Sequence, residues 1–184
     1  MLQGIKLKAN PKNHQKTILS QWMGCARYIW NAKVIENKEK RGKLNSKETK
    51  KYPSVDKTYS KYKNKETTPW LYQCPSQILR NSVSNWADTY QKFFKKLCGR
   101  PKLKKKDGRG SAYLTRELFK FEKCKDGVTR LFIGSKNNNI GYLSIKNHQK
   151  CFLDRAVISF FYLIHFSVSY PCSILPSALL HFQH

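Results

Sequence analysis

The side chains best able to do chemistry in this chain are cations, and their densest group lies at residues 100–106. That run reads Arg-Pro-Lys-Leu-Lys-Lys-Lys and is followed by glycines at 108 and 110, so it is predicted to form a loop. Lysine and arginine bind phosphate groups, which gives affinity and salt dependence without sequence information. The predicted phosphate contacts, which include two lysines near the N-terminus, are Lys6, Lys8, Arg100, Lys102, Lys104, Lys105 and Lys106.

Four polar residues at the start of a predicted helix form a second candidate group. Arginine and asparagine at a helix start can make bidentate contacts to guanine or adenine edges. Helix capping and solvated polar side chains would give the same pattern, so both interpretations stay open. The candidate base-reading residues are Ser76, Gln77, Arg80 and Asn81.

Two further polar residues, Arg27 and Asn31, lie one turn apart beside an apolar stripe. The planar guanidinium of Arg27 could meet a phosphate, or it could pair with helix carbonyls or a carboxylate. Asn31 shares that face, and a structural hydrogen bond is the favoured use for its amide. Both are kept as candidate nucleic-acid contacts.

Cysteine and histidine spacing gives no metal site. The six cysteines are widely spaced without a C-x-x-C pair, and the five histidines show no ligand spacing. We therefore expect neither a zinc ribbon nor a disulfide framework, and no metal or cofactor.

Charge divides the chain at about residue 150. The 184 residues carry a net charge of +25, and the last 34 contain one aspartate and one arginine. A chain of this length can form one domain with a real core, or one small domain with appendages, but not two complete enzymatic domains. Such concentrated positive charge predicts a partner that supplies phosphates, although a basic surface that only confers solubility is the alternative.

Apolar periodicity predicts an α+β chain. Alternation over residues 2–9 indicates a strand, and Asn10-Pro11 is typical of a helix start. Gly24 is predicted to break the next stripe, giving two helices that resemble a helix-turn-helix. Trp86, Tyr90, Phe93 and Phe94 are spaced as a core stripe rather than a base-stacking surface. The remaining predicted elements are a short helix at 54–62, a strong helix at 75–99, an extended segment at 113–121, and strands at 128–133 and 140–145.

The last segment, residues 148–184, is apolar but poorly periodic. Its run at 156–168 is too short to span a bilayer, and two prolines interrupt any extension. The sequence predicts an unrelated tail, either disordered or translated from beyond a frame break.

Several motifs occur in a recognisable order. They are Gly24-Cys-Ala-Arg-Tyr-Ile-Trp-Asn31, Trp70-Leu71, Pro75-Ser-Gln77, Phe93-Phe94, Gly99-Arg-Pro-Lys-Leu-Lys104 and Ile140-Gly-Tyr-Leu-Ser-Ile145. Over about residues 1–147 the chain resembles the N-terminal part of the transposon-encoded OrfB/TnpB family of transposases.

This resemblance implies a nucleic-acid-binding domain at 1–147. Its strand at 2–9 and the strands within 100–147 would form a small, WED-like β-barrel, with a helical recognition lobe at 10–99 inserted. Such a lobe and barrel hold a transposon-end-derived guide RNA and target DNA, while a downstream RuvC-like domain cuts with three metal-binding carboxylates. After Lys146 this chain offers only Asp154, so no catalytic residue is expected.

We interpret the sequence as a truncated transposase-family protein that binds guide-like RNA and DNA without cleavage. Three alternatives stay open: part of an intact RNA-guided endonuclease, a basic ribonucleoprotein scaffold, and a non-functional remnant. No membrane partner is expected. We expect a cytoplasmic location, with association to the nucleoid if the source is bacterial.

Overall fold

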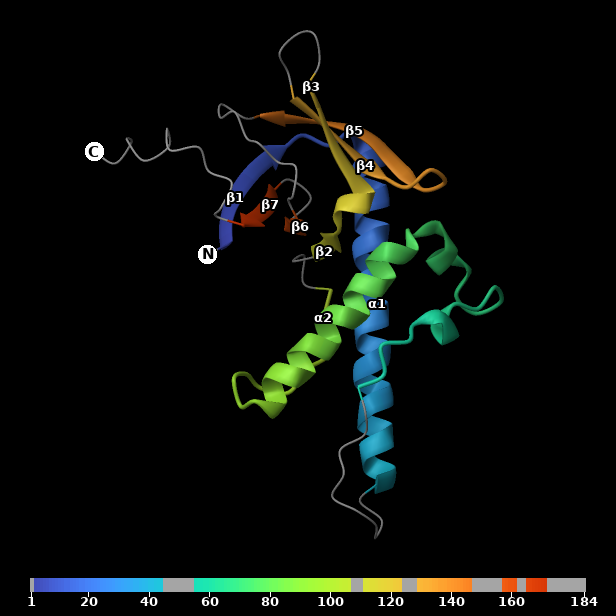
Figure 1. Cartoon of the computed structure of the whole chain (residues 1–184). Coiled ribbons are helices and arrows are strands. Elements are labelled where there is room, and N and C mark those ends of the chain that lie inside the picture. Colours follow the sequence, from blue (N-terminus) through green and yellow to red (C-terminus); the bar gives the residue numbers. More distant parts are fainter. Residues whose placement is uncertain are drawn as a thin grey trace, which may run out of the picture.

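The computed structural model describes residues 2–44, 55–106, 111–123, 129–146, 157–161 and 165–171. It confirms an α+β chain with two helices and an antiparallel sheet (Figure 1). Within the described residues no helix is both long and apolar enough to cross a membrane. The helices are α1 Asn13–Leu44 and α2 Ser76–Phe94, with 3-10 turns η1 Ser60–Tyr62, η2 Pro69–Gln73 and η3 Arg116–Leu118. The strands are β1 Leu2–Ala9, β2 Ser111–Leu114, β3 Phe119–Lys123, β4 Thr129–Gly134, β5 Asn139–Lys146, β6 Val157–Phe161 and β7 His165–Pro171.

The sheet has the order β2-β6-β7-β1-β5-β4-β3, and every pairing is antiparallel. Strand β1 lies inside it, paired with β7 from Leu2 to Lys8 and with β5 at Lys8 and Ala9. Gly134 closes the β4–β5 hairpin at a φ of +136°, where an added Cβ would lie 2.2 Å from the Cα of Asn139. The predicted strands at 2–9, 128–133 and 140–145 are confirmed.

Two strands of the sheet come from the segment predicted as a tail. β6 pairs with β2 along Ser111–Leu114, and β7 pairs with β6 and β1. Residues 148–156, 162–164 and 172–184 lie outside the described residues. A tail unrelated to the domain is therefore not confirmed, because its two described strands belong to the same sheet as β1.

The predicted helix break at Gly24 is wrong, because α1 continues through it to Leu44. Glycine inside a helix costs only about 1 kcal/mol relative to alanine. Apolar side chains on both sides of Gly24, such as Trp22 and Ala26, are buried in one core, so packing outweighs that cost. Helix α1 then packs against α2 (Figure 1).

The predicted helix at 54–62 is also wrong, since only the 3-10 turn η1 forms there. Asp56 accepts a hydrogen bond from the backbone N–H of Thr58 at 2.8 Å. Such a local side-chain bond favours a turn over helix continuation.

Helix α2 matches the strongest prediction but ends earlier than Gly99. Lys96 takes the left-handed conformation, with φ at +58°, and the N–H of Leu97 donates to the carbonyl of Lys92. This is a Schellman-type end formed without glycine. Trp86 and Tyr90 are buried as predicted, whereas Phe94, beyond the last full turn of core contacts, is 41% exposed.

A buried glutamine joins α1 to the sheet. Gln15 donates its side-chain amide to the carbonyls of Ile140 and Tyr142, both at 3.1 Å, and accepts from the N–H of Lys12. Buried backbone groups need such partners. Gln15 therefore fixes the first turn of α1 against β5, over a distance in sequence that no local pattern reveals.

A charge network holds residues 55–62 against α1. Lys33, only 1% exposed, lies 3.0 Å from a carboxylate oxygen of Asp56 and 3.5 Å from one of Glu36. Lys61 approaches the Glu36 carboxylate at 2.6 Å, and the Tyr62 hydroxyl donates to it as well. Ion pairs and hydrogen bonds to α1, rather than helical structure, hold this segment in place.

Because of this network, the free energy of unfolding should depend on pH in the acidic range. Partial burial acts against ionisation of Glu36, but hydrogen bonds from Lys40, Lys61 and Tyr62 outweigh it and lower its pKa from 4.5 to about 2. A lowered folded-state pKa contributes stability that is complete above the ordinary pKa and is lost as pH falls toward the folded one. We expect the free energy of unfolding in urea to fall between pH 4.5 and about 2. The Glu36→Gln variant should show a flatter profile there, and an unchanged profile would contradict the assignment.

Candidate nucleic-acid interface

The basic run at residues 100–106 is held in place by two neighbouring residues of α1. The indole N–H of Trp30 donates to the carbonyl of Lys102 at 2.9 Å. The side-chain amide of Asn31 accepts from the N–H of Lys104 at 2.8 Å and donates to its carbonyl at 3.0 Å. The run is therefore an ordered extension beside α1, with its lysines exposed.

Two cations of this run lie over aromatic rings. The ammonium of Lys104 is 3.9 Å from the ring centre of Trp30, and the guanidinium of Arg100 is 5.1 Å from that of Phe93. Burial of its end lowers the pKa of Lys104. Neither cation pairs with a carboxylate among the described residues. Both keep a charge that an anionic partner can use.

The four candidates at the start of α2 have different surroundings. Gln77 donates to the carboxylate of Glu117, and Arg80 lies 3.6 Å from the same group. Asn81 is buried and donates to the carbonyl of Tyr113 at 3.0 Å, while Ser76 is exposed. Asn81 thus supports β2, and one carboxylate offsets the charge of Arg80.

Removing the Glu117 charge should strengthen nucleic-acid binding. In Glu117→Gln the guanidinium of Arg80 is released from its carboxylate partner, and surface pairs of this kind are worth about 0.2–1 kcal/mol. We expect RNA affinity to rise about threefold, measured by filter binding. Glu66→Gln is the matched control, because Glu66 is exposed and pairs with no cation among the described residues. Equal effects of the two variants would mean that only net charge matters.

The remaining candidates are spread over α1 and β1. Arg27 is half-buried, with no hydrogen bond or ion pair recorded within the described residues, and Asn31 makes the structural hydrogen bonds favoured for it. Lys6 and Lys8 lie on β1 opposite Ser167 and His165, and their side chains lie outside the described part. The structure brings Asn31 to Lys104.

Sequence reasoning missed the role of Trp30 and of the acidic residue Glu117. Trp30 is part of the Trp-Asn pair that anchors the basic run, yet its contact spans 72 positions in sequence. Glu117 lies 40 positions from Gln77. Neither contact leaves a signal in local spacing. No group of three potential metal ligands occurs in the part of the chain that the structure describes.

Comparison with known proteins finds relatives among transposon-encoded proteins. Residues 1–44, which contain β1 and the whole of α1, match the helix-turn-helix domain of the OrfB family. A relative in Escherichia coli (strain K12), named "Putative RNA-guided DNA endonuclease InsQ", is 29% identical over 115 residues. The chain has an OrfB/TnpB-family N-terminal part.

The OrfB/TnpB resemblance covers only part of each protein, which limits the conclusions that it supports. The alignment includes 61% of this chain but only 27% of InsQ, so the chain spans about a quarter of that relative's length. The OrfB family model describes a helix-turn-helix, whereas α1 here is one continuous helix that packs on α2. A nucleic-acid-binding helical domain of the transposase type is what the match supports.

Proposed function

We propose that this chain binds RNA from the end of its transposon, together with DNA, and does not cut either. The observation that carries the proposal is the ordered basic run at 100–106, which α1 anchors through Trp30 and Asn31 while Lys102, Lys105 and Lys106 stay exposed. A fixed row of cations suits a phosphate backbone, since less side-chain and loop freedom is lost on binding.

In this proposal the helices serve as the recognition lobe and the sheet as the small barrel. The base-reading residues are Ser76, Gln77 and Arg80, with Arg27 supplying a further phosphate contact. Lys6 and Lys8 extend the phosphate contacts along β1. The protein would act in the cytoplasm, near the nucleoid in a bacterial host.

A second candidate function is that of one portion of an RNA-guided endonuclease. The limited share of InsQ that is matched favours it, since a longer relative contains regions without a counterpart here. Sequencing the transcript beyond the codon for His184 would distinguish the two candidates. An in-frame continuation with clustered carboxylates supports the endonuclease.

The test of binding is a filter-binding titration of the whole chain across a salt series. One probe is RNA transcribed from the flanking transposon end, and the other is a scrambled RNA of equal length. A preference for the first that persists as salt rises supports the proposal. Equal binding that falls steeply with salt would reduce the function to that of a polycation.

A further inference from the structure

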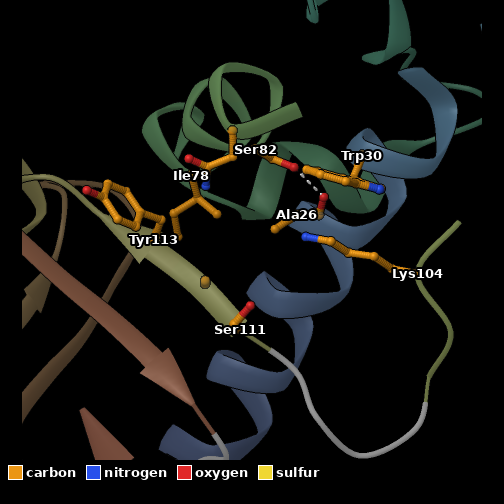
Figure 2. A pocket seen from close by; sticks show the side chains of 9 residues that line it. Ala26, Trp30, Ile78, Ser82, Lys104, Ser111 and Tyr113 are labelled. Carbon is orange, nitrogen blue, oxygen red and sulfur yellow. Dashed lines mark hydrogen bonds between the residues drawn. The ribbon is translucent and has the colours of Figure 1, made fainter. Parts of the chain in front are cut away.

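A pocket of about 310 Å³ opens between α1, α2, β2 and the basic run (Figure 2). Its volume lies at the lower end of the range for small-molecule sites, roughly 300–1,000 Å³. It is therefore of a size for one small ligand rather than for a duplex. None of the predicted base-reading residues lines it.

The floor of the pocket is apolar and rigid. Ile78 of α2 and Ala112 of β2 are almost fully buried beneath it. Ser82 of α2 donates to the carbonyl of Ala26 of α1 at 2.6 Å, and this bond, drawn in Figure 2, holds the two helices together at the pocket wall. A flat apolar group can lie on such a floor without losing hydrogen bonds.

One cation reaches into this space. Figure 2 shows the Lys104 side chain crossing from the basic run, with its nitrogen directed toward Ala26. Its backbone is clamped by Asn31 and its ammonium lies over Trp30, so the position of the charge is fixed. Among the described residues, no carboxylate lines the pocket and Lys104 has no acidic partner. Within that part of the chain, the site has a fixed positive charge without a counter-ion from the protein.

The rim offers neutral hydrogen-bonding groups. Asn85 of α2 and Ser111 of β2 are exposed there, and neither side chain has a recorded hydrogen bond within the described ranges. An amide and a hydroxyl can each donate and accept, which suits the edge of a nucleobase. A fixed cation, an apolar floor and neutral donors and acceptors together match the parts of a nucleotide.

We infer that this pocket holds one unpaired nucleotide of the bound RNA, with its phosphate at Lys104 and its base against Ile78 and Ala112. The inference rests on the proposed function and adds a site to it. Proteins recognise RNA sequence mostly at unpaired bases, because only these can leave the stack and enter a pocket. The basic run leads the phosphate backbone to the pocket mouth.

Three short RNA duplexes of otherwise identical sequence test the inference on the whole chain. One is fully paired, one carries a single unpaired uridine, and one carries an abasic residue at that position. We expect the uridine-containing duplex to bind about tenfold more tightly than either of the others, as one charged hydrogen bond and a buried base allow. The abasic duplex separates recognition of the base from recognition of a bent backbone or a phosphate alone.

Lys104→Met should abolish the tenfold preference, because it keeps the apolar stem and the backbone bonds to Asn31 but removes the charge. Lys105→Met is the matched control, and it should weaken all three complexes equally. Lys104→Arg, which keeps the charge, should retain part of the preference.

A preference that survives in Lys104→Met, or an abasic duplex that binds as tightly as the uridine one, would overturn the inference. Equal binding of all three RNAs to the unmodified chain would contradict the pocket site but not the proposed function. Absence of any binding would contradict both.

Discussion

Replacing Lys33 with alanine should lower the free energy of unfolding by about 2–5 kcal/mol, the usual range for truncating a long, fully buried side chain to alanine. Lys33 is 1% exposed and faces two carboxylates, those of Asp56 and Glu36. Without its ammonium, Glu36 and Asp56 lose their buried cation, and among the described residues they keep only the exposed Lys40 and Lys61 nearby. The lost stem also leaves a gap beside Trp86. Urea unfolding followed by circular dichroism measures the change.

Lys38→Ala supplies the control for this result. Lys38 lies on the same helix and is exposed, so its replacement should change stability by about 0.5 kcal/mol or less. Lys33→Met keeps the stem, and its cost should fall between those of the two alanine variants. A Lys33→Ala variant as stable as Lys38→Ala would show that the segment at 55–62 is held by other contacts.

Replacing Lys102, Lys105 and Lys106 together with glutamine should have the largest effect on binding. Each phosphate contact contributes about 0.7–0.9 to the slope of log affinity against log salt, so the slope should fall by about 2. Affinity near physiological salt should fall about a hundredfold if each contact is worth about 1 kcal/mol. Filter binding to a single RNA across a salt series measures both quantities.

The same loss of charge elsewhere provides the comparison. Lys38, Lys57 and Lys65 are exposed lysines outside the basic run, and replacing all three with glutamine removes an equal net charge. We expect a much smaller change in slope for that variant. Equal slopes would mean that the chain binds through its overall charge rather than through residues 100–106.

Elements whose stability is local were predictable from the sequence. The stripe of α2 and the alternation of β4 and β5 repeat at the helix and strand periods, and both predictions are confirmed. Helix ends and breaks were less predictable, because they depend on small free-energy contributions that compete with one another. Packing around Gly24 outweighs the weak helix propensity of glycine, and a lysine rather than Gly99 forms the turn after α2.

The candidate site could be predicted by residue type but not by arrangement. Charge density identified the basic run, and the Trp-Asn pair belongs to a motif that the sequence offered. Its attachment to Lys102 and Lys104 depends on contacts more than 70 positions apart, which only the fold supplies. For the same reason Asn81, an apparent surface residue at a helix start, is a buried support for β2.

The pairing of β1 with β7 has a consequence for synthesis on the ribosome. β1 is made before every other element described here, yet its partner along Leu2–Lys8 ends at Pro171. The α1–α2 pair and the β3–β4–β5 meander can form earlier, since their partners lie closer in the chain. Until residue 171 emerges, the nascent chain must carry an unpaired strand, which is open to wrong pairing with other chains. The sheet of this domain is therefore completed only after the helix pair and the meander can have formed, when β7 pairs with β1.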